Sequence, residues 1–482
     1  MSSPLIKPLR TPNGYYCFDG NQVELLNIGV EEYEYLKKVE EKKIEFSSSA
    51  SPLIQDHYLE GYFHPSTVRE IKHQDAEYLH SLLSRKLSML TLQVTQKCNF
   101  RCKYCVYMEN EESIQRAHSQ KVMEWDIAKN AVDFLWKHSV DSERVNVGFY
   151  GGEPLLEFGL IKRVVEYCKM IFAGKPLSFS ITTNGTLLSN EIIQYFSEHE
   201  IKLMVSLDGT KEVNDTNRVF ADGRGTYDAV MKSLSRLRET NPEYANNLYI
   251  SMVMDPKNDF DCYNITNIGS GDFYRRNLSS TIVDKDYISK RPQYSVDYIW
   301  KYEYHMFLAY LAHFNRYCEG AVSPISASSM SGIVTNSEKL ETAQPLREVD
   351  APSGPCVPGQ MRLFCDVNGR FFPCERVSES SEAMNIGNTI GGIDVNKAKS
   401  LLNVGAITSE ECSNCWCFRL CELCAKKADV GKSYLSAEKK SQNCALERLK
   451  AEEKLLNYLL LKEIPVFYSE HVRKINTGGF NG

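Results

Sequence analysis

The sequence predicts an α/β protein, in which a partial (β/α)6 TIM barrel lies between a winged-helix-like N-terminal module and a cysteine-rich C-terminal domain. Two observations predict this fold. Short apolar segments alternate with helical segments from residue 87 to 290, and twelve of the sixteen cysteines fall in two stretches, 98–105 and 356–444. Repeated strand–helix units favour a parallel sheet with right-handed crossovers. Clustered cysteines favour metal ligation over scattered core thiols.

Six apolar segments are expected to form the barrel strands, and four amphipathic segments between them the helices. Six strands make a partial barrel rather than a closed eight-stranded one, and the chemistry of such folds lies at the carboxyl ends of the strands. The strands are expected at Leu90–Thr95, Val145–Tyr150, Ser178–Thr183, Lys202–Leu207, Tyr249–Met254 and Ser279–Asp284. The helices are expected at Ile127–His138, Gly159–Ile171, Glu191–Glu198 and Tyr227–Thr240.

Residues 1–86 form a separate module in this interpretation. Two short apolar runs, Tyr15–Asp19 and Val23–Ile28, flank Gly20-Asn21 and predict a β-hairpin. Glu31–Glu40 has apolar residues at helical spacing, and a second helix is expected near Ser66–Ile71. A hairpin with packed helices fits a winged-helix-like module.

The rest of the chain divides into three further parts. Residues 291–355 are expected to be a helical linker in which SPISASSMSG, at 323–332, is a loop. Residues 356–445 form the cysteine-rich domain, and residues 446–482 a C-terminal helix and tail.

Charge and hydropathy exclude two classes of partner. The formal net charge is −6 and no basic block is present, so nucleic-acid binding is not expected. The most apolar helix candidate, near 299–314, contains Lys301, Glu303 and two histidines, which excludes a membrane span. The N-terminus lacks the apolar run of a signal peptide, so we expect a cytoplasmic protein with reduced cysteines.

The first cysteine stretch follows the first barrel strand and reads Cys98-x3-Cys102-x2-Cys105. A cubane of four irons normally takes four thiolates, so three close cysteines leave one iron open to a small ligand. The alternative is a zinc site with a distant fourth ligand, but structural zinc usually repeats CxxC or pairs it with histidine. The aromatic Tyr104 fits beside such a cluster.

CNFRCKYC resembles the signature of the radical S-adenosylmethionine (SAM) superfamily. In that family the open iron binds SAM, and one electron splits the cofactor to give a 5′-deoxyadenosyl radical that abstracts a substrate hydrogen. GGEP after the second strand, TTNG after the third, SLDG after the fourth and a later arginine resemble the family's SAM contacts. The resemblance implies cofactor contacts at Tyr104, Gly151, Gly152, Glu153, Pro154, Asn184, Ser206, Asp208 and Arg218.

The second cysteine stretch resembles the SPASM extension of radical SAM enzymes, which holds two auxiliary [4Fe-4S] clusters. Gly369-x4-Cys374 precedes the motif CxxC-x5-CxxC, which begins at Cys412. The last two cysteines of this motif, Cys421 and Cys424, are separated by two residues, where the family commonly has three. Two zinc ribbons are the alternative. The resemblance implies a distal cluster on Cys412, Cys415, Cys421 and Cys444, and a proximal one on Cys356, Cys374 and Cys424.

Cys365 is the candidate for the fourth proximal ligand, although it lies in an expected strand, Leu363–Val367; otherwise a substrate cysteine could bind there. Cys417 is interpreted as a packed thiol near the clusters, and Cys17, Cys168, Cys262 and Cys318 as core or surface thiols. Glu375, directly after Cys374, is a candidate catalytic base, the alternative being a surface carboxylate.

The N-terminal TPNGYYCFDGNQVELLNIGVEEYEYL resembles the leader-peptide recognition module of radical peptide maturases. This implies a leader strand added to the hairpin edge, whereas a DNA-binding winged helix would need a basic recognition helix. The expected function is maturation of a ribosomally made precursor peptide by forming a thioether, with a flavodoxin or ferredoxin as electron donor. Carbon–carbon or ether cross-linking, formylglycine formation in a sulfatase, and a three-cluster electron carrier are the alternatives.

Overall fold

The N-terminal module is a three-stranded antiparallel sheet followed by two helices. The computed structural model describes residues 3–107, 116–263, 278–283 and 293–464. The hairpin and first helix are confirmed, and a further strand precedes them in the order β1-β2-β3. Pro8 lies in β1, and proline is typical of an edge strand. The elements are β1 Ile6–Arg10, β2 Tyr15–Asp19, β3 Glu24–Ile28, α1 Val30–Glu40 and α2 Pro52–Leu59.

The helix expected near Ser66–Ile71 is wrong. The second helix is α2, where the Ser51 side chain accepts a hydrogen bond from the Ile54 amide and a proline stands in the first turn. Residues 70–71 instead form strand β4, which pairs in parallel with β11, Val349–Asp350. A distant segment therefore provides the backbone partners that a helix would have provided locally.

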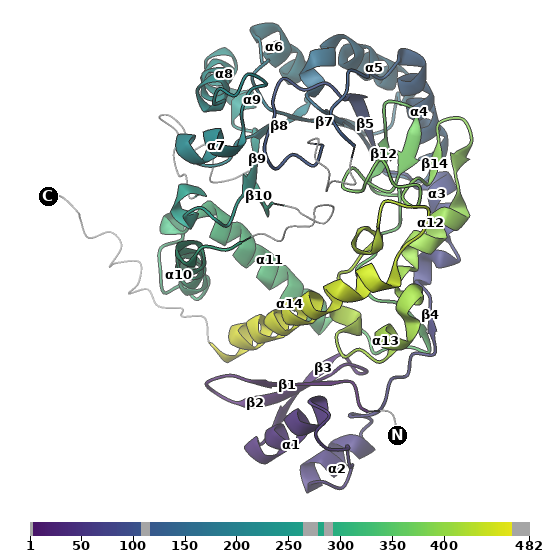
Figure 1. Ribbon diagram of the computed structural model, residues 1–482, viewed down its shortest axis with the longest axis vertical. Coiled ribbons are helices and arrows are strands. Elements are labelled where there is room, and N and C mark those ends of the chain that lie inside the picture. Colours follow the sequence, from purple (N-terminus) through teal and green to yellow (C-terminus); the bar gives the residue numbers. More distant parts are fainter. Residues whose placement is uncertain (1–2, 108–115, 264–277, 284–292, 465–482) are drawn as a thin grey trace, which may run out of the picture.

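The barrel prediction is confirmed. Six parallel strands lie side by side in chain order, from β5 at one end to β10 at the other, and Figure 1 shows helices around their outer side. The strands are β5 Met89–Thr95, β6 Val145–Gly151, β7 Leu177–Thr183, β8 Lys202–Ser206, β9 Tyr249–Met254 and β10 Leu278–Ile282. The helices are α3 Leu79–Arg85, α4 Trp125–His138, α5 Phe158–Ile171, α6 Asn190–Glu198, α7 Lys211–Asn217, α8 Tyr227–Thr240 and α9 Pro242–Ala245.

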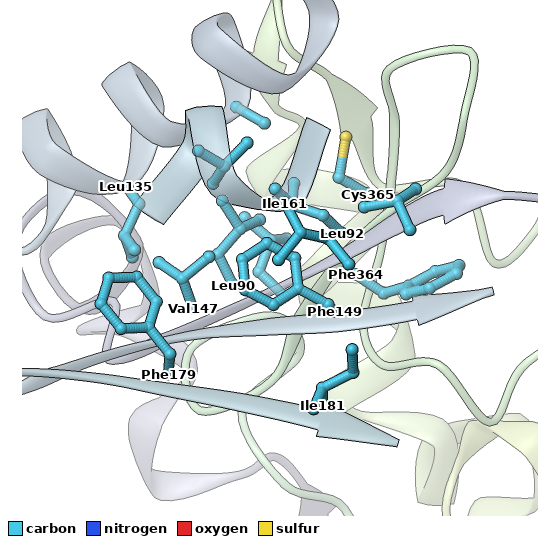
Figure 2. Packing of buried hydrophobic residues seen from close by; sticks show 14 of the residues in the cluster. Leu90, Leu92, Leu135, Val147, Phe149, Ile161, Phe179, Ile181, Phe364 and Cys365 are labelled. Carbon is cyan, nitrogen blue, oxygen red and sulfur yellow. The ribbon is translucent and has the colours of Figure 1, made fainter. Parts of the chain in front are cut away.

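Alternation along the strands separates an apolar face from a polar one. Leu92, Phe149 and Ile181 belong to the main core, which also contains Leu135 and Ile161 from the helices (Figure 2). Each such buried side chain contributes on the order of 1.5–3 kcal/mol. The alternate positions, which include Gln93, Tyr150 and Thr182, face the inside of the barrel. The inner face is thus left to polar chemistry.

The sheet continues into the cysteine-rich segment. Strand β12 pairs in parallel with β5, on the side away from β6, and three short antiparallel strands follow it. The segment from residue 356 is therefore joined to the barrel by backbone hydrogen bonds. These elements are β12 Leu363–Cys365, β13 Arg370–Phe372, β14 Gly387–Asn388, β15 Gly392–Ile393, α12 Val395–Leu402 and α13 Ser409–Ser413.

Residues 291–355 contain two long helices, α10 Val296–His313 and α11 Pro324–Glu341. The loop expected at 323–332 is wrong, because those residues begin α11. Pro324 stands in its first turn, and small residues such as Ser326, fully buried, let neighbouring helices approach closely. Within the described residues, no helix is both long and apolar enough to cross a membrane.

The last helix, α14 Ala437–Glu463, joins the N-terminal module to the cysteine-rich segment (Figure 1). Phe18 and Leu9 of the module share a hydrophobic cluster with Leu455 of α14 and Cys412. The boundary expected at residue 445 falls inside this one helix, and the boundary expected at 290 lies outside the described residues.

Candidate functional site

Cys98, Cys102 and Cys105 lie together in the loop after β5. Burial raises the pKa of Cys98 to about 12, and negative charge on the other two thiols contributes. Burial likewise raises the pKa of Cys102 to about 12 and that of Cys105 in the same direction. Three neighbouring buried thiolates need a cation to balance them, which fits an iron–sulfur cluster. In the described part of the chain, no three His, Cys, Asp or Glu side chains converge closely enough to chelate a single metal ion.

Gly151 and Gly152 hold this loop against the end of β6. The Gly152 amide donates to the Thr95 carbonyl at 2.9 Å, and the Glu153 amide donates to the Lys97 carbonyl at 2.8 Å. A Cβ atom at Gly151, whose φ is +145°, would overlap the Thr95 carbonyl, and one at Gly152 would overlap the Lys97 carbonyl. The two glycines therefore allow close backbone contact with the cysteine loop itself.

Glu153 and Asn184 tie the neighbouring strand ends together. The buried Glu153 carboxylate accepts hydrogen bonds from the Thr183 hydroxyl at 2.6 Å and from the Asn184 amide at 2.7 Å. The Asn184 side chain in turn donates to Asn99 of the cysteine loop at 2.7 Å. Pro154 follows in a short 3-10 turn. These residues, expected as cofactor contacts, thus also brace the loop that carries the thiols.

The pKa of Glu153 predicts a pH-dependent stability. Burial raises this pKa to about 6, from 4.5. Because the folded value is the higher one, the stabilisation is fully present below pH 4.5 and is lost as the pH rises through about 6. The free energy of unfolding of the wild type, relative to Glu153→Gln, should therefore fall by about 2 kcal/mol between pH 4.5 and 7.5. Urea titrations of the apoprotein measure this, and a difference that is constant with pH would contradict it.

Asp208, Arg218 and Tyr104 form a buried cluster beside Cys102. Arg218 Nε lies 2.9 Å from Asp208 Oδ2, and Tyr104 donates its hydroxyl hydrogen to the same carboxylate. The Arg218 charge lowers the pKa of Cys102, although burial outweighs it. Ser206, at the end of β8, lies opposite Ser251 of β9. The polar residues expected after the third and fourth strands are thus brought to the same edge as the cysteine loop.

A pocket of about 280 Å³ lies beside the cysteine loop. His118 contributes to it, and its Nε2 lies 3.8 Å from Cys105 Sγ. Burial lowers the pKa of His118 to about 4, and the charges of Arg101 and Arg116 act in the same direction. His118 is therefore neutral at neutral pH. The residues that line the pocket are Lys97, Cys98, Asn99, Arg101, His118, Ser119, Gln120 and Leu156.

A buried network on the inner face of the barrel was not expected from the sequence. Glu379 accepts hydrogen bonds from Gln93 at 2.6 Å and from Arg116 Nε at 2.7 Å, and its other partner is the Tyr107 hydroxyl. Arg116 stacks 3.5 Å from the centre of the Tyr107 ring. No sequence motif joins residues so far apart in the chain. The one feature that could have indicated this network is the polar Gln93 inside an otherwise apolar strand.

Five cysteines gather between α13 and α14. Cys417 lies between Cys415 and Cys421, and its hydrogen bonds lower the pKa of both; that of Cys415 falls to about 6. Cys412 and Cys421 both act electrostatically on Cys444. The four expected distal ligands are thus neighbours, and Cys417 is a buried thiol beside two of them, Cys415 and Cys421.

Cys356, Cys374 and Cys424 form a second group. Burial raises the pKa of Cys356, and the charge of the neighbouring Cys424 adds to the rise. Burial also raises the pKa of Cys374 to about 11, and the charge of Cys356 adds to that rise. Cys365 is not part of this group. It pairs with Leu92 across the sheet and lies in the main core (Figure 2), and its thiol contacts the Asp366 carbonyl at 3.6 Å. The position of Cys365 therefore argues against the expected fourth ligand, because its strand register turns it toward the helices.

Glu375 is half-buried rather than exposed on the surface. It forms an ion pair with Arg362, and the Oε2 atom of Glu375 is buried without a hydrogen-bond partner among the described residues. Burial raises the pKa of Tyr150, and negative charge on Glu375 and Cys105 contributes to the same rise. Tyr150, near the end of β6, is thus within electrostatic reach of both Cys105 and Glu375, and its ring packs against Phe364 of β12 with the ring centres 6.4 Å apart.

Residues 92–266 match the profile of the Radical SAM superfamily. This stretch, which contains most of the barrel, is therefore similar to the radical SAM domain. An uncharacterized protein of Methanocaldococcus jannaschii is 34% identical over 169 residues, which is 35% of this chain and 54% of that protein. The radical SAM cyclopropyl synthase TigE of Paramaledivibacter caminithermalis is 24% identical over 275 residues, 52% of this chain and 56% of TigE.

A cysteine-type anaerobic sulfatase-maturating enzyme of Clostridium novyi is 28% identical over 166 residues, 33% of this chain and 42% of that enzyme. The chain thus spans about half the length of the curated relatives it matches. Native anSMEcpe, solved with bound AdoMet, has the same fold with a TM-score of 0.54 at 20% identity, over 77% of this chain and 98% of that one.

Proposed function

We propose that the chain is a radical SAM enzyme that modifies a ribosomally made precursor peptide. The observation that carries this proposal is the position of Tyr150, which lies near the end of β6 and packs against Phe364 of β12, with the ring centres 6.4 Å apart. A substrate held there would lie between the SAM-cleaving site and the second cysteine segment. The sheet pairing of β12 with β5 fixes these two parts relative to each other.

Cys98, Cys102 and Cys105 would hold the SAM-binding [4Fe-4S] cluster. When bound, that cluster and SAM supply the 5′-deoxyadenosyl radical that abstracts a hydrogen atom. The chain's own residues orient the cofactor and exclude water: Asp208 and Arg218 present fixed charges beside Cys102. A flavodoxin or ferredoxin in the cytoplasm would supply the electron.

The five-cysteine group would hold the distal auxiliary cluster, through Cys412, Cys415, Cys421 and Cys444. The three-cysteine group would hold the proximal one, with a cysteine of the peptide as the remaining ligand. We infer that the product is a thioether between that sulfur and a carbon of another residue. Forming it removes one hydrogen atom to 5′-deoxyadenosine, one proton to a base and one electron to the auxiliary clusters.

Glu375 would be the base, because its Oε2 is buried and lacks a partner. Replacing it with glutamine in Glu375→Gln is expected to lower peptide product formation by about 100-fold or more. Release of 5′-deoxyadenosine should remain within about twofold, since Glu375 is not among the groups that act most strongly on Cys98, Cys102 or Cys105. Liquid chromatography of both products measures the split. Glu382→Gln removes the same charge from an exposed ion pair with Lys397 and should change neither product; equal loss of both products in Glu375→Gln would contradict the assignment.

The N-terminal sheet would bind the leader of the precursor. Within the described residues, β3 pairs only with β2, so its other edge can accept a strand. The test of the function is mass spectrometry of a cysteine-containing precursor peptide after co-expression. Loss of a hydrogen pair per link, together with disappearance of the free thiol, supports a thioether. A lost hydrogen pair with the thiol intact would indicate a carbon–carbon or ether link.

Formylglycine formation is the second candidate, because sulfatase-maturating enzymes are among the relatives. A new aldehyde on the peptide, which a hydrazine probe detects, would identify it and contradict cross-linking.

A further inference from the structure

One face of helix α14 carries two cations around a cysteine. Lys440, Cys444 and Arg448 are spaced four residues apart, so their side chains lie on the same face of the helix. This face meets the five-cysteine group: negative charge on Cys412 and Cys421 raises the pKa of Cys444, and the charges of Lys440 and Arg448 lower it, while burial dominates.

Lys440 is buried against the first of the distal cysteines. Only 2% of its surface is exposed. Its ammonium group donates to the Thr408 hydroxyl at 2.6 Å and to Cys412 Sγ at 3.1 Å. In the part of the chain that the structure describes, no carboxylate forms an ion pair with it. A buried ammonium group without a counter-charge is costly, so Lys440 requires an anionic group where the thiols meet.

Arg448 adds positive charge from the opposite side of Cys444. Hydrogen bonds from Cys417 are the main cause of the lowered pKa of Cys415, and Arg448 lowers it further by its charge and a hydrogen bond. Arg448 is exposed, so solvent screens its charge more than that of Lys440.

The cations beside the three-cysteine group differ in exposure and pairing. Arg362, which is partly exposed, lowers the pKa of Cys374, whereas Glu375 raises it; Arg362 and the exposed Arg376 both form ion pairs with Glu375. The two cysteine groups therefore differ: one has a buried cation hydrogen-bonded to a thiol, and the other has partly exposed cations paired with a carboxylate.

We propose that Lys440 is a positioning residue that raises the reduction potential of the distal cluster above that of the proximal one. The proposal rests on the proposed function, in which these cysteines hold the auxiliary clusters. Hydrogen bonds to ligand sulfurs and local charge set the potential of an iron–sulfur cluster. A buried ammonium group stabilises the added electron. The electron left over from bond formation would therefore pass from the proximal to the distal cluster.

The test is a redox titration of the reconstituted full-length protein, followed by electron paramagnetic resonance. The Cys415→Ala variant, which lacks a distal ligand, assigns the distal signal. In Lys440→Met the midpoint potential of that signal is expected to shift to more negative values at unchanged iron content. Lys440→Arg, which keeps the charge, should retain most of the wild-type value. Lys439→Met removes the same charge from the next position, about 100° around the helix, and should leave the potential unchanged.

An unshifted distal potential in Lys440→Met with intact iron would overturn the role of Lys440 while leaving the proposed function standing. If Lys440→Met fails to retain iron, Lys440→Gln, which removes the charge but keeps a hydrogen-bond donor, decides: a shift to more negative values supports the proposal, and no shift overturns it. Wild-type protein without any auxiliary signal would instead contradict the proposed function itself, and the role of Lys440 with it.

Discussion

Replacing Cys102 by alanine is expected to abolish cleavage of SAM, with 5′-deoxyadenosine falling to background. Cys102 is one of three thiols that lie together in the loop after β5, and the charge of Arg218 acts on it directly. Two thiolates cannot leave a single open iron on a stable cubane cluster. The expected loss is therefore of the site as a whole. Anaerobic incubation with SAM and dithionite, followed by chromatography, measures the product.

Cys318→Ala is the matched control for this prediction. Cys318 is exposed and belongs to none of the three cysteine groups. Its removal should change neither the iron content nor the yield of 5′-deoxyadenosine. Residual SAM cleavage in Cys102→Ala at more than a few per cent of the wild-type rate would show that this loop does not hold the reactive cluster. A rate of a few per cent corresponds to a rise in the activation free energy on the order of 1.4–2.7 kcal/mol.

Replacing Gly152 by alanine is expected to destroy the same activity from a position that has no thiol. The added methyl group would overlap the Lys97 carbonyl oxygen, and the Gln96 carbonyl lies 3.0 Å away, so backbone rather than a flexible side chain would have to move. The overlap should displace the cysteine loop at a cost of about 2–4 kcal/mol. We expect reconstituted Gly152→Ala to lose most of the SAM-site iron while keeping its far-ultraviolet circular dichroism.

Gly159→Ala provides the comparison, because nothing lies within 4 Å of a Cβ atom at that position in α5. Alanine favours a helix interior over glycine, so this variant should be as active as wild type and no less stable. Full iron binding by Gly152→Ala would mean that the glycine contact does not fix the loop.

The barrel could be predicted from the sequence because each of its strands is a local pattern. Alternating apolar residues and the polar motifs after them are all encoded within a few positions. The main cysteine groups could be predicted for the same reason, because most of their members lie within a few positions of one another. Cys365 shows the limit: it is the candidate for the fourth proximal ligand, but its pairing with Leu92 of a distant strand turns its thiol into the core.

The errors share a physical cause. SPISASSMSG is typical of a loop by composition, yet its small residues form the start of α11, where they allow close helix packing. A helix is expected near Ser66–Ile71, but Glu70 and Ile71 pair with Val349–Asp350, nearly three hundred positions away along the chain. The Arg116–Glu379 network likewise joins separate segments. In each case tertiary contacts decide what local sequence leaves open.

The contact between the two ends of the described chain has a consequence for its biosynthesis. Glu463, the last residue of α14, accepts hydrogen bonds from Thr11 at 2.5 Å, Tyr16 at 2.7 Å and Asn13 at 3.1 Å. A ribosome completes the first sheet long before it makes that helix, and domains generally fold in the order of synthesis. The first sheet must therefore wait, undocked, until translation has passed α14, so its docking is a late, post-translational step of assembly.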